Sequence, residues 1–548
     1  MKISGAARWL ATLAVFPFSP YLAAAAPVSS LTVDTKCNKY TGVIDDGIVQ
    51  FLGIRYAAPP VGHLRFMPPE DPSCSDGVQL ANEHGKLCLA TNADPGATDT
   101  SEDCLFLDIY APSSAKPGSK LPVFFFLQGG GFNSLSNPNL NGRGLVKASG
   151  DNIIVVTFNY RVGPYGFITN GDEITPNNGL LDQRKALRWV NKYISHFGGD
   201  PGHVVLGGDS AGAASISLQM TAYGGRKETD LFHAGAAESV SFATVLTVRE
   251  AQYQYDNFTL AAGCSSSDSK SKESSLACLR SKSAQQLQAA NTGSAYPGAP
   301  YAPLYPWGPV VDGDLVPSVT YKAFASGAFI KIPLIVGDDT NEGTTFTPRD
   351  TSTQQESDDF LRAQFPYLTK SQLEKIADLY PNRNASSCPD EGCYWRQLSD
   401  AYGDLRYTCP GLYISSALAL SGERRSYSYH FDVEDPDQVA EGLGVPHTVE
   451  LNAIFGPENV PDPPASYRAG GVNEEVVGVV QGYWTSFIRS FDPNKYRARG
   501  SARWRVWDPV VKDRLLFKTG GKTRMEFVGG DMRKKCDYFY SIGEEIRQ

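Results

Sequence analysis

The sequence predicts an α/β fold built on a large, mainly parallel sheet flanked by helices. Short apolar runs recur at residues 121–127, 153–158, 203–206 and 332–336, and longer helical or turn-rich stretches separate them. Such runs are typical of parallel strands that are covered on both faces. The composition, with 41% hydrophobic and 20% charged residues, excludes a disordered or collagen-like chain and allows a large core.

A strand-helix-strand unit is predicted around residues 181–197, which lie between the second and third apolar runs. Within this stretch, the apolar residues that recur at helical spacing are Leu187, Val190, Ile194 and Phe197. The alternation of polar and aromatic residues at 426–431 predicts a further strand. We interpret residues 260–290 and 350–420 as helical insertions into this framework.

Residues 1–26 are expected to form a secretory signal peptide. Lys2 and Arg8 precede a mostly apolar stretch, and four alanines at residues 23–26 offer a site for signal peptidase. No Pro/Gly/Ser-rich linker divides residues 27–548, so we expect one large catalytic domain there. No later stretch approaches the ~20 apolar residues of a membrane span, which favours a secreted, extracellular protein.

Charge and cysteine usage exclude several classes of partner and cofactor. The net charge is −9 without a long basic run, which argues against nucleic-acid binding. Ten cysteines and sequons at Asn257 and Asn384 agree with an oxidising secretory route and with glycosylation. Cys388 and Cys393 lie close together without a nearby histidine, so we interpret them as a small disulfide loop and expect no metal site.

A G-x-S-x-G motif at residues 208–212 places Ser210 between the predicted strand 203–206 and a helix-forming run. A nucleophile on such a sharp turn has strained backbone angles, and the two glycines remove side chains that would collide there. The amide of Ala211 then faces a developing oxyanion near the helix N-terminus. No lysine follows the motif, and residues 129–131 lack the later glycine of a dinucleotide-binding loop, so we expect no cofactor.

The general base is sought among the seven histidines. In this architecture the triad follows the chain order serine, acid, histidine, which leaves His430 and His447 after room is allowed for an acid-bearing strand. His430 belongs to the alternating strand 426–431, where a packed or surface-facing imidazole is the simpler interpretation. His447 lies in the glycine-containing loop 442–448, and we therefore predict that it is the base.

The acid is expected directly after the strand at 332–336. Asp338, Asp339 and Glu342 all follow this strand, and spacing alone does not choose among them. A second glycine-rich turn, QGGGF at residues 128–132, follows the strand at 121–127. Three consecutive glycines allow bare backbone amides to converge on one point, as in an oxyanion hole.

Together these motifs resemble the type-B carboxylesterase/lipase family, which includes cholinesterases and fungal lipases and has the α/β-hydrolase fold. The resemblance extends over nearly all of residues 27–548. Besides the two glycine-rich motifs, the ordered blocks that carry it are FLGIRY at 51–56, PPVG at 59–62, SEDCLFLD at 101–108, NYR at 159–161, NGLLDQ at 178–183, FGGDP at 197–201, PVVDG at 309–313 and GVPH at 444–447.

The resemblance implies hydrolysis of a small-molecule carboxylic ester through an acyl-enzyme. It selects Glu342 as the acid beside Ser210 and His447, because the family places its acid in an N-x-x-E-G-like block. The amides that it implies for the oxyanion hole are those of Gly130, Gly131 and Ala211. The substrate pocket is expected to include Phe132, Tyr305 and Trp307, although the last two rings are equally compatible with core packing.

The family's disulfides also map onto this chain. The resemblance implies the pairs Cys88 with Cys104, Cys264 with Cys278, and Cys409 with Cys536, and it leaves the pairing of Cys37, Cys74, Cys388 and Cys393 open. Two residues depart from the family's pattern. Gln128 replaces the histidine common before the glycines, and Asp209 replaces the usual glutamate before the serine. Neither position supplies a reacting atom.

The loop closed by the Cys88–Cys104 bridge indicates which kind of ester to expect as substrate. Residues 89–103 are short and acidic with one large apolar residue, so they cannot form the amphipathic lid of family lipases. We therefore expect soluble, short-to-medium acyl esters as substrates. The alternatives are a lipase or a transacylase with the same triad, and a non-catalytic, cholinesterase-like binding protein. No feature of the sequence points to a particular oligomeric state.

Overall fold

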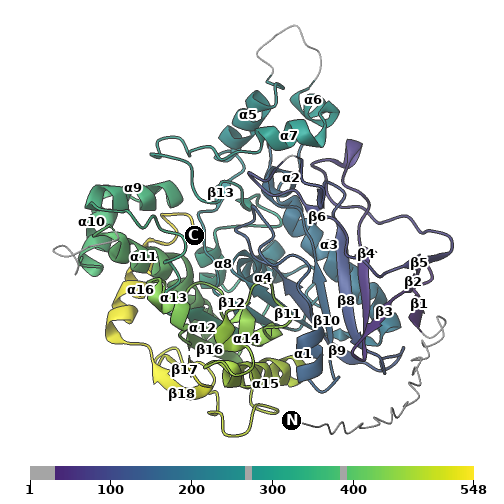
Figure 1. Cartoon of the computed structure of the whole chain (residues 1–548). Helices are drawn as coiled ribbons and strands as arrows, with labels where there is room; N and C mark the ends of the chain where they lie inside the picture. The colour runs from purple at the N-terminus through teal and green to yellow at the C-terminus, as the bar shows by residue number, and fades with distance from the viewer. Residues whose placement is uncertain (1–30, 95, 266–273, 383–391) are drawn as a thin grey trace, which may run out of the picture.

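The computed structural model describes residues 31–94, 96–265, 274–382 and 392–548 (Figure 1). The predicted signal peptide at residues 1–26, the sequon at Asn384, and Cys388 lie outside the described residues. The sequon at Asn257 is described, and its asparagine is exposed. Within the described ranges, no helix has the length and apolar character needed to cross a membrane.

Over the described residues, one sheet of eleven strands forms the centre of the molecule, and its inner strands are parallel. In spatial order the strands are β18 (Lys522–Phe527), β17 (Asp513–Lys518), β16 (Ser426–Asp432), β15 (Leu334–Asp339), β12 (Ala234–Glu238), β11 (Gly199–Asp209), β9 (Leu121–Leu127), β10 (Ile154–Phe158), β8 (Phe106–Pro112), β4 (Ile48–Arg55) and β3 (Val43–Asp45). Antiparallel pairs lie toward the two edges: β17 with β18 at one edge, and the successive pairs between β10, β8, β4 and β3 at the other.

Short strands form small satellite sheets around this centre. These strands are β1 (Thr32–Asp34), β2 (Lys39–Thr41), β5 (Val78–Leu80), β6 (Leu87–Cys88), β7 (Thr100–Ser101), β13 (Leu246–Thr247) and β14 (Val310–Val311). The pairs β6–β7 and β13–β14 are each parallel.

Alternating side chains of β9 enter two separate cores. Val123, Phe125 and Leu127 join the core on one face of the sheet, whereas Phe124 and Phe126 join the core on the other face. This is the period of two that a strand imposes on its side chains. Because both faces must be apolar, the sequence of this strand is a continuous apolar run.

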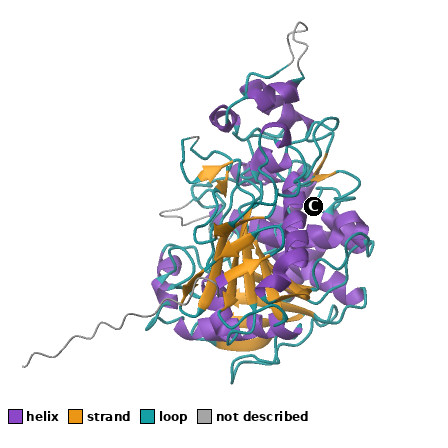
Figure 2. Ribbon diagram, turned by 90° about the vertical axis from the view of Figure 1, so that its right-hand side faces the viewer, coloured by secondary structure: helices purple, strands orange, loops and turns teal. Residues whose placement is uncertain are grey.

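Helices cover both faces of the sheet, as Figure 2 shows. On one face lie α1 (Arg143–Ala148), α14 (Leu451–Phe455) and α15 (Glu474–Ser490). On the other face lie α2 (Gly163–Phe167), α3 (Asn178–Tyr193), α4 (Ala211–Thr221), α8 (Thr320–Ala325) and α12 (Cys409–Leu420). The predicted helix at residues 181–197 corresponds to α3 and a final 3-10 turn at Ile194–Phe197.

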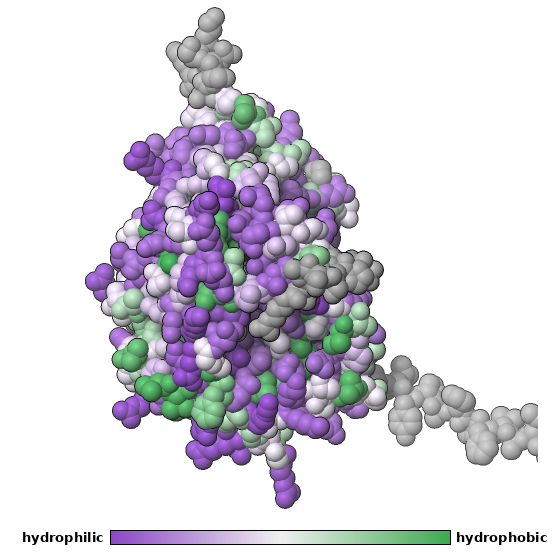
Figure 3. Space-filling view, turned by 90° about the vertical axis from the view of Figure 1, so that its left-hand side faces the viewer, coloured by the Kyte–Doolittle hydropathy of each residue, from purple (hydrophilic) through white to green (hydrophobic). Residues whose placement is uncertain are grey.

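The predicted insertion at 260–290 and most of that at 350–420 stand apart from these two layers. The end of the second was wrongly included, because it forms α12, which packs on the sheet. In Figure 1, α5 (Gln252–Ala261), α6 (Ser275–Ser281) and α7 (Ala284–Ala290) lie above the sheet. A third core packs the other insertion against the last helix. Its helices are α9 (Gln354–Gln364), α10 (Lys370–Leu379), α11 (Trp395–Gly403), the π-helical turn η5 (Asp404–Thr408) and α16 (Gly530–Ile542), while α13 (Pro436–Ala440) lies separately before the His447 loop. The molecular face drawn in Figure 3 is mostly hydrophilic, with apolar side chains in small groups.

Disulfides join Cys88 to Cys104, Cys264 to Cys278, and Cys409 to Cys536, which are the three pairs that the family resemblance implies. A further bridge joins Cys37 to Cys74, whose pairing the sequence left open. Because a cross-link restricts the unfolded chain, a bridge that closes a longer loop stabilises the fold more.

Removal of the Cys409–Cys536 bridge by double alanine substitution is expected to lower the free energy of unfolding by about 5 kcal/mol, because this bridge spans 127 residues. Removal of the Cys88–Cys104 bridge, which spans 16 residues, should cost about 3 kcal/mol and serves as the matched comparison. Denaturant unfolding of both variants measures the difference. Equal losses, or a larger loss for the shorter loop, would contradict this prediction.

Candidate active site

Ser210 lies on the turn between β11 and α4, with φ 53° and ψ −117°. Such a conformation is strained for a residue with a side chain, and it is typical of a nucleophile elbow. The turn is also crowded: a Cβ on Gly212 would lie 1.9 Å from the carbonyl oxygen of Leu127. The motif glycine is therefore required by close packing of the helix against β9, as the sequence predicts.

Parallel strands bring the predicted residues to one edge of the sheet. In the ladder, Asp209 at the end of β11 pairs with Glu238 at the end of β12, which in turn pairs with Gly337 in β15. The segments that follow these strands thus begin at the same carboxyl edge, where α/β proteins place their sites. Ser210 follows β11 directly, and Glu342 lies three residues beyond the end of β15 at Asp339.

The structure brings Glu342 and His447 together. The Nδ1–H of His447 donates a hydrogen bond to Oε2 of Glu342, whose side chain is almost fully buried. The other carboxylate oxygen, Oε1, accepts a hydrogen bond of 2.8 Å from the amide of Asp339. Asp338 instead pairs with Arg514 at 3.1 Å, and Asp339 accepts a bond of 2.7 Å from the amide of Thr448.

The second histidine left by the sequence, His430, is occupied elsewhere. Its Nδ1 lies 2.7 Å from Oε1 of Glu526, and its Nε2 lies 2.9 Å from the hydroxyl of Thr340. Among the described residues, the Nε2 atom of His447 is buried and has no hydrogen-bond partner. Of the two imidazoles, His447 therefore has the nitrogen that is free to accept a proton.

Burial controls the protonation of the Glu342–His447 pair. It lowers the pKa of His447 to about 4, an effect that Arg406 reinforces and that the carboxylates of Glu450 and Asp209 oppose. Burial also raises the pKa of Glu342, whereas the amide of Asp339 and the hydroxyl of Ser239 act to lower it. At neutral pH the imidazole is thus neutral, which is the form that can act as a general base.

The glycine loop lies against the nucleophile. A Cβ on Gly129 would be 2.9 Å from Cβ of Ser210, so the loop and the serine are in close contact. Gly130 and Gly131 have positive φ angles of 105° and 61°. Within the described part of the chain, the amides of Gly130, Gly131 and Ala211 donate no hydrogen bond to another protein group. They can therefore bind an oxyanion.

The two departures from the family pattern hold this loop in place. Asp209 accepts a hydrogen bond of 2.9 Å from the amide of Gly129 and one of 3.2 Å from the side chain of Asn137. Burial raises the pKa of Asp209 to about 6. Gln128 donates to the carbonyl of Phe158 at 3.1 Å and accepts from the amide of Asn137 at 3.2 Å. Both side chains thus fix the backbone that precedes the oxyanion amides.

A small cavity begins at the glycine loop. Phe132, Tyr305 and Trp307 all line it, together with Gly131. The ring of Tyr305 packs so closely on Gly131 that a Cβ there would lie 2.1 Å from it. The side chain of Asn133 binds both backbone groups of Trp307. It accepts a hydrogen bond of 3.1 Å from the amide and donates one of 2.7 Å to the carbonyl. Of the two aromatic residues that the sequence left undecided, Trp307 is buried and Tyr305 is partly buried, and both border the cavity.

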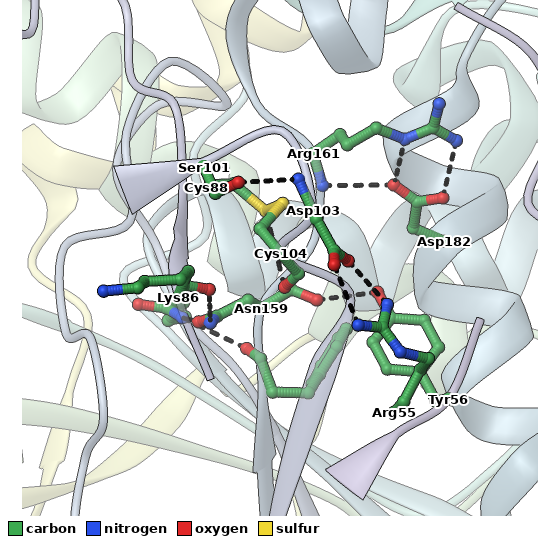
Figure 4. The surroundings of a disulfide bond; sticks show 12 residues. Arg55, Tyr56, Lys86, Cys88, Ser101, Asp103, Cys104, Asn159, Arg161 and Asp182 are labelled. Atoms are coloured by element: carbon green, nitrogen blue, oxygen red, sulfur yellow. Dashed lines mark hydrogen bonds and ion pairs between the residues drawn. A yellow bond between two sulfur atoms is a disulfide. The ribbon is translucent and has the colours of Figure 1, made fainter. Parts of the chain in front are cut away.

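The loop closed by the Cys88–Cys104 disulfide, whose surroundings Figure 4 shows, is anchored to neighbouring segments of the chain. Thr91 donates its amide to the carbonyl of Asn133 at 2.8 Å, and Gln288 of α7 donates to the carbonyl of Ala90 at 2.6 Å. Near the disulfide, Asp103 forms an ion pair with Arg55. The described residues of this loop contain no helix, so no amphipathic helix lies over the cavity from this segment.

The sequence interpretation missed two buried ionic residues beside the site. Glu450, three positions after His447, accepts a hydrogen bond of 2.8 Å from the hydroxyl of Tyr429. Arg406, in η5, also lines the cavity. The sequence could have indicated Glu450, because it lies only three residues after His447. It gives no indication that Arg406 belongs to the site, because an arginine in a helical stretch is usually exposed.

Comparisons with known proteins find relatives over most of the chain. The carboxylesterase family matches residues 29–534 of the chain. The chain is 33% identical to Lipase 1 of Geotrichum candidum over 398 residues, which cover 64% of this chain and 69% of that protein. It is 29% identical to Secreted lipase 4 of Gibberella zeae over 491 residues, covering 87% and 85%.

An animal relative and a solved structure extend the match. Cocaine esterase of Oryctolagus cuniculus is 30% identical over 491 residues, which cover 85% of this chain and 86% of that protein. The crystal structure of EstA from Aspergillus niger superposes with a TM-score of 0.88 at 39% sequence identity. The superposition covers 94% of this chain and 99% of EstA. The predicted α/β-hydrolase fold is thereby confirmed.

Proposed function

The chain belongs to the carboxylesterase family and is a carboxylic ester hydrolase, and from this premise we propose that Ser210, His447 and Glu342 perform the reaction. The proposal rests on the hydrogen bond from Nδ1 of His447 to Glu342. Because this bond occupies Nδ1, the other ring nitrogen, Nε2, which has no partner among the described residues, is the one that accepts the proton of Ser210. Ser210 lies at the same edge of the sheet, on the turn between β11 and α4. Its hydroxyl is the nucleophile of the G-x-S-x-G turn.

In the acylation step, Oγ of Ser210 attacks the ester carbonyl carbon while Nε2 of His447 accepts the hydroxyl proton. The tetrahedral intermediate places its negative oxygen against the amides of Gly130, Gly131 and Ala211. Glu342 stabilises the imidazolium that forms beside it. The intermediate then collapses, the C–O bond to the alcohol breaks, and Nε2 returns the proton to the departing alkoxide.

Deacylation repeats these events with water as the nucleophile. Nε2 of His447 accepts a proton from water as its oxygen attacks the acyl-serine carbonyl. Collapse of the second intermediate releases the carboxylic acid and returns the proton to Oγ of Ser210. Besides the ester and water, the groups in these steps are side chains and backbone amides of this chain.

We propose that residues 27–548 act as one catalytic domain outside the cell, after removal of a signal peptide at residues 1–26. Four disulfides among the described cysteines support an oxidising compartment. The fungal relative named as a secreted lipase is similar over most of this chain. The exposed Asn257 is available for glycosylation.

The proposed substrates are dissolved esters with short-to-medium acyl groups. The cavity has a volume of about 70 Å³. This is small beside the ~300–1,000 Å³ of a pocket for a drug-sized ligand, so it favours a short acyl group. The anchored Cys88–Cys104 loop adds no apolar helix that would dock onto an oil surface.

The rate of hydrolysis across esters of graded acyl length tests this proposal. We expect the highest kcat/KM for short-to-medium acyl groups, because long chains exceed the small cavity. The rate should rise smoothly with the concentration of dissolved ester. A sharp jump as a long-chain ester passes its solubility limit would show instead that the protein is a lipase with a lid elsewhere.

A further inference from the structure

Arg406 is a buried cation in the wall of the cavity. Only 4% of the residue is exposed, and its Nε–H donates a hydrogen bond of 3.0 Å to Oγ of Ser241. Ser241 lines the same cavity. Arg406 lies on the π-helical turn η5, and single π-helical turns frequently occur at functional sites.

No carboxylate among the described residues forms an ion pair with Arg406. Its guanidinium carbon instead lies 5.4 Å from the ring centroid of Tyr305, 5.7 Å from that of Tyr402 and 5.8 Å from that of Tyr407. These rings stabilise a cation through their faces but provide no negative charge. A buried arginine is ordinarily paired with an acid, so this cavity wall lacks a counter-ion.

A short chain of contacts places Arg406 next to the nucleophile. The amide of Ser241 donates to the carbonyl of Ser210 at 3.4 Å, and the amide of Phe242 donates to the carbonyl of Arg406 at 2.8 Å. The segment after β12 therefore contacts both residues. Gly131, one of the oxyanion glycines, lines the same cavity as Arg406. An acyl group bound to Ser210 would extend from the glycine loop toward the guanidinium.

We propose that Arg406 binds a carboxylate at the far end of the acyl group, so that the preferred substrates are half esters of short dicarboxylic acids. This inference rests on the proposed function of Ser210. The planar guanidinium provides parallel N–H donors that match a carboxylate, which supplies the missing counter-ion. A succinyl group, with about seven heavy atoms, is among the short acyl groups that this small cavity favours.

A pair of esters of similar shape tests the proposal on the unmodified enzyme. Monoethyl succinate carries the carboxylate, and ethyl 4-methylpentanoate carries an isopropyl group of similar size in its place. We expect kcat/KM to be about 10- to 100-fold higher for monoethyl succinate, as for a hydrogen-bonded charge pair. Equal rates, or a preference for the neutral ester, would overturn the role of Arg406 while leaving the ester hydrolase function intact.

Substitution of Arg406 separates specificity from folding. Arg406→Gln should lose the preference for monoethyl succinate but retain hydrolysis of ethyl 4-methylpentanoate, and Arg406→Lys should restore part of the preference through its charge. The neutral ester reports whether each variant is folded and active. A parallel loss on both esters in two soluble variants would mean that Arg406 is only structural. Absence of hydrolysis of every ester by the unmodified enzyme would refute the proposed function itself.

Discussion

Replacement of Ser210 by alanine is expected to lower kcat by about 10⁶-fold, because it removes the only atom that forms the acyl-enzyme. The methyl group fits the turn, since the elbow already accommodates a Cβ at this position. Folding and the oxyanion amides should be unaffected, so a small residual rate above the uncatalysed reaction remains. Steady-state hydrolysis of a dissolved ester measures the loss.

Ser217→Ala is the matched control for this variant. Ser217 lies on the helix that follows the nucleophile, is also buried, and donates only a long bond of 3.4 Å to the carbonyl of Ala213. Its removal should leave kcat within about twofold of the unmodified enzyme. A Ser210→Ala protein that kept more than about 1% of the activity would require another nucleophile.

Replacement of His447 by alanine is expected to lower kcat by about 10⁴-fold or more, since the serine then lacks a base and the leaving alcohol lacks an acid. The loss should appear in kcat and not in the affinity for substrate, because the imidazole acts on the hydroxyl of Ser210. Single-turnover kinetics with a chromogenic ester separate acylation from substrate binding.

His430→Ala is the control here, because His430 is the other histidine that the chain order allows. Its ring is held by Glu526 and Thr340, away from the Glu342–His447 pair. Activity per folded molecule should remain near normal in this variant. Near-normal turnover in the His447 variant, or a greater loss in the His430 variant, would contradict the assignment of the base.

Much of the fold was predictable because the sheet imposes simple patterns on the sequence. The run at 121–127 is apolar throughout since both faces of β9 are buried, and it forms a strand over those same residues. The boundaries were less predictable. β11 begins at Gly199, before the apolar run at 203–206, and β15 extends through two acidic residues to Asp339. Hydrogen bonds and ion pairs satisfy the buried polar residues within these strands, and the pattern of apolar residues in the sequence does not predict such contacts.

The residues of the candidate site were predictable to different degrees. Ser210 follows from a local rule, because its turn requires nearby glycines in the sequence. The acid does not, since Asp338, Asp339 and Glu342 follow the same strand and only tertiary partners distinguish them. Arg514 pairs with the first of these, whereas His447 pairs with the last. Arg406 also depends on tertiary structure, because no motif contains it and its burial among the rings of Tyr305, Tyr402 and Tyr407 arises only in the folded chain.

The central claim, that His447 activates Ser210, is tested most directly by covalent labelling with diisopropyl fluorophosphate. Attack by Oγ on phosphorus releases fluoride and leaves a stable diisopropylphosphoryl serine, which intact mass and peptide mapping detect. We expect one adduct per molecule, on the peptide that contains Ser210, with labelling absent in Ser210→Ala and slowed by orders of magnitude in His447→Ala. Labelling of a different residue, or an unchanged rate in His447→Ala, would contradict the account.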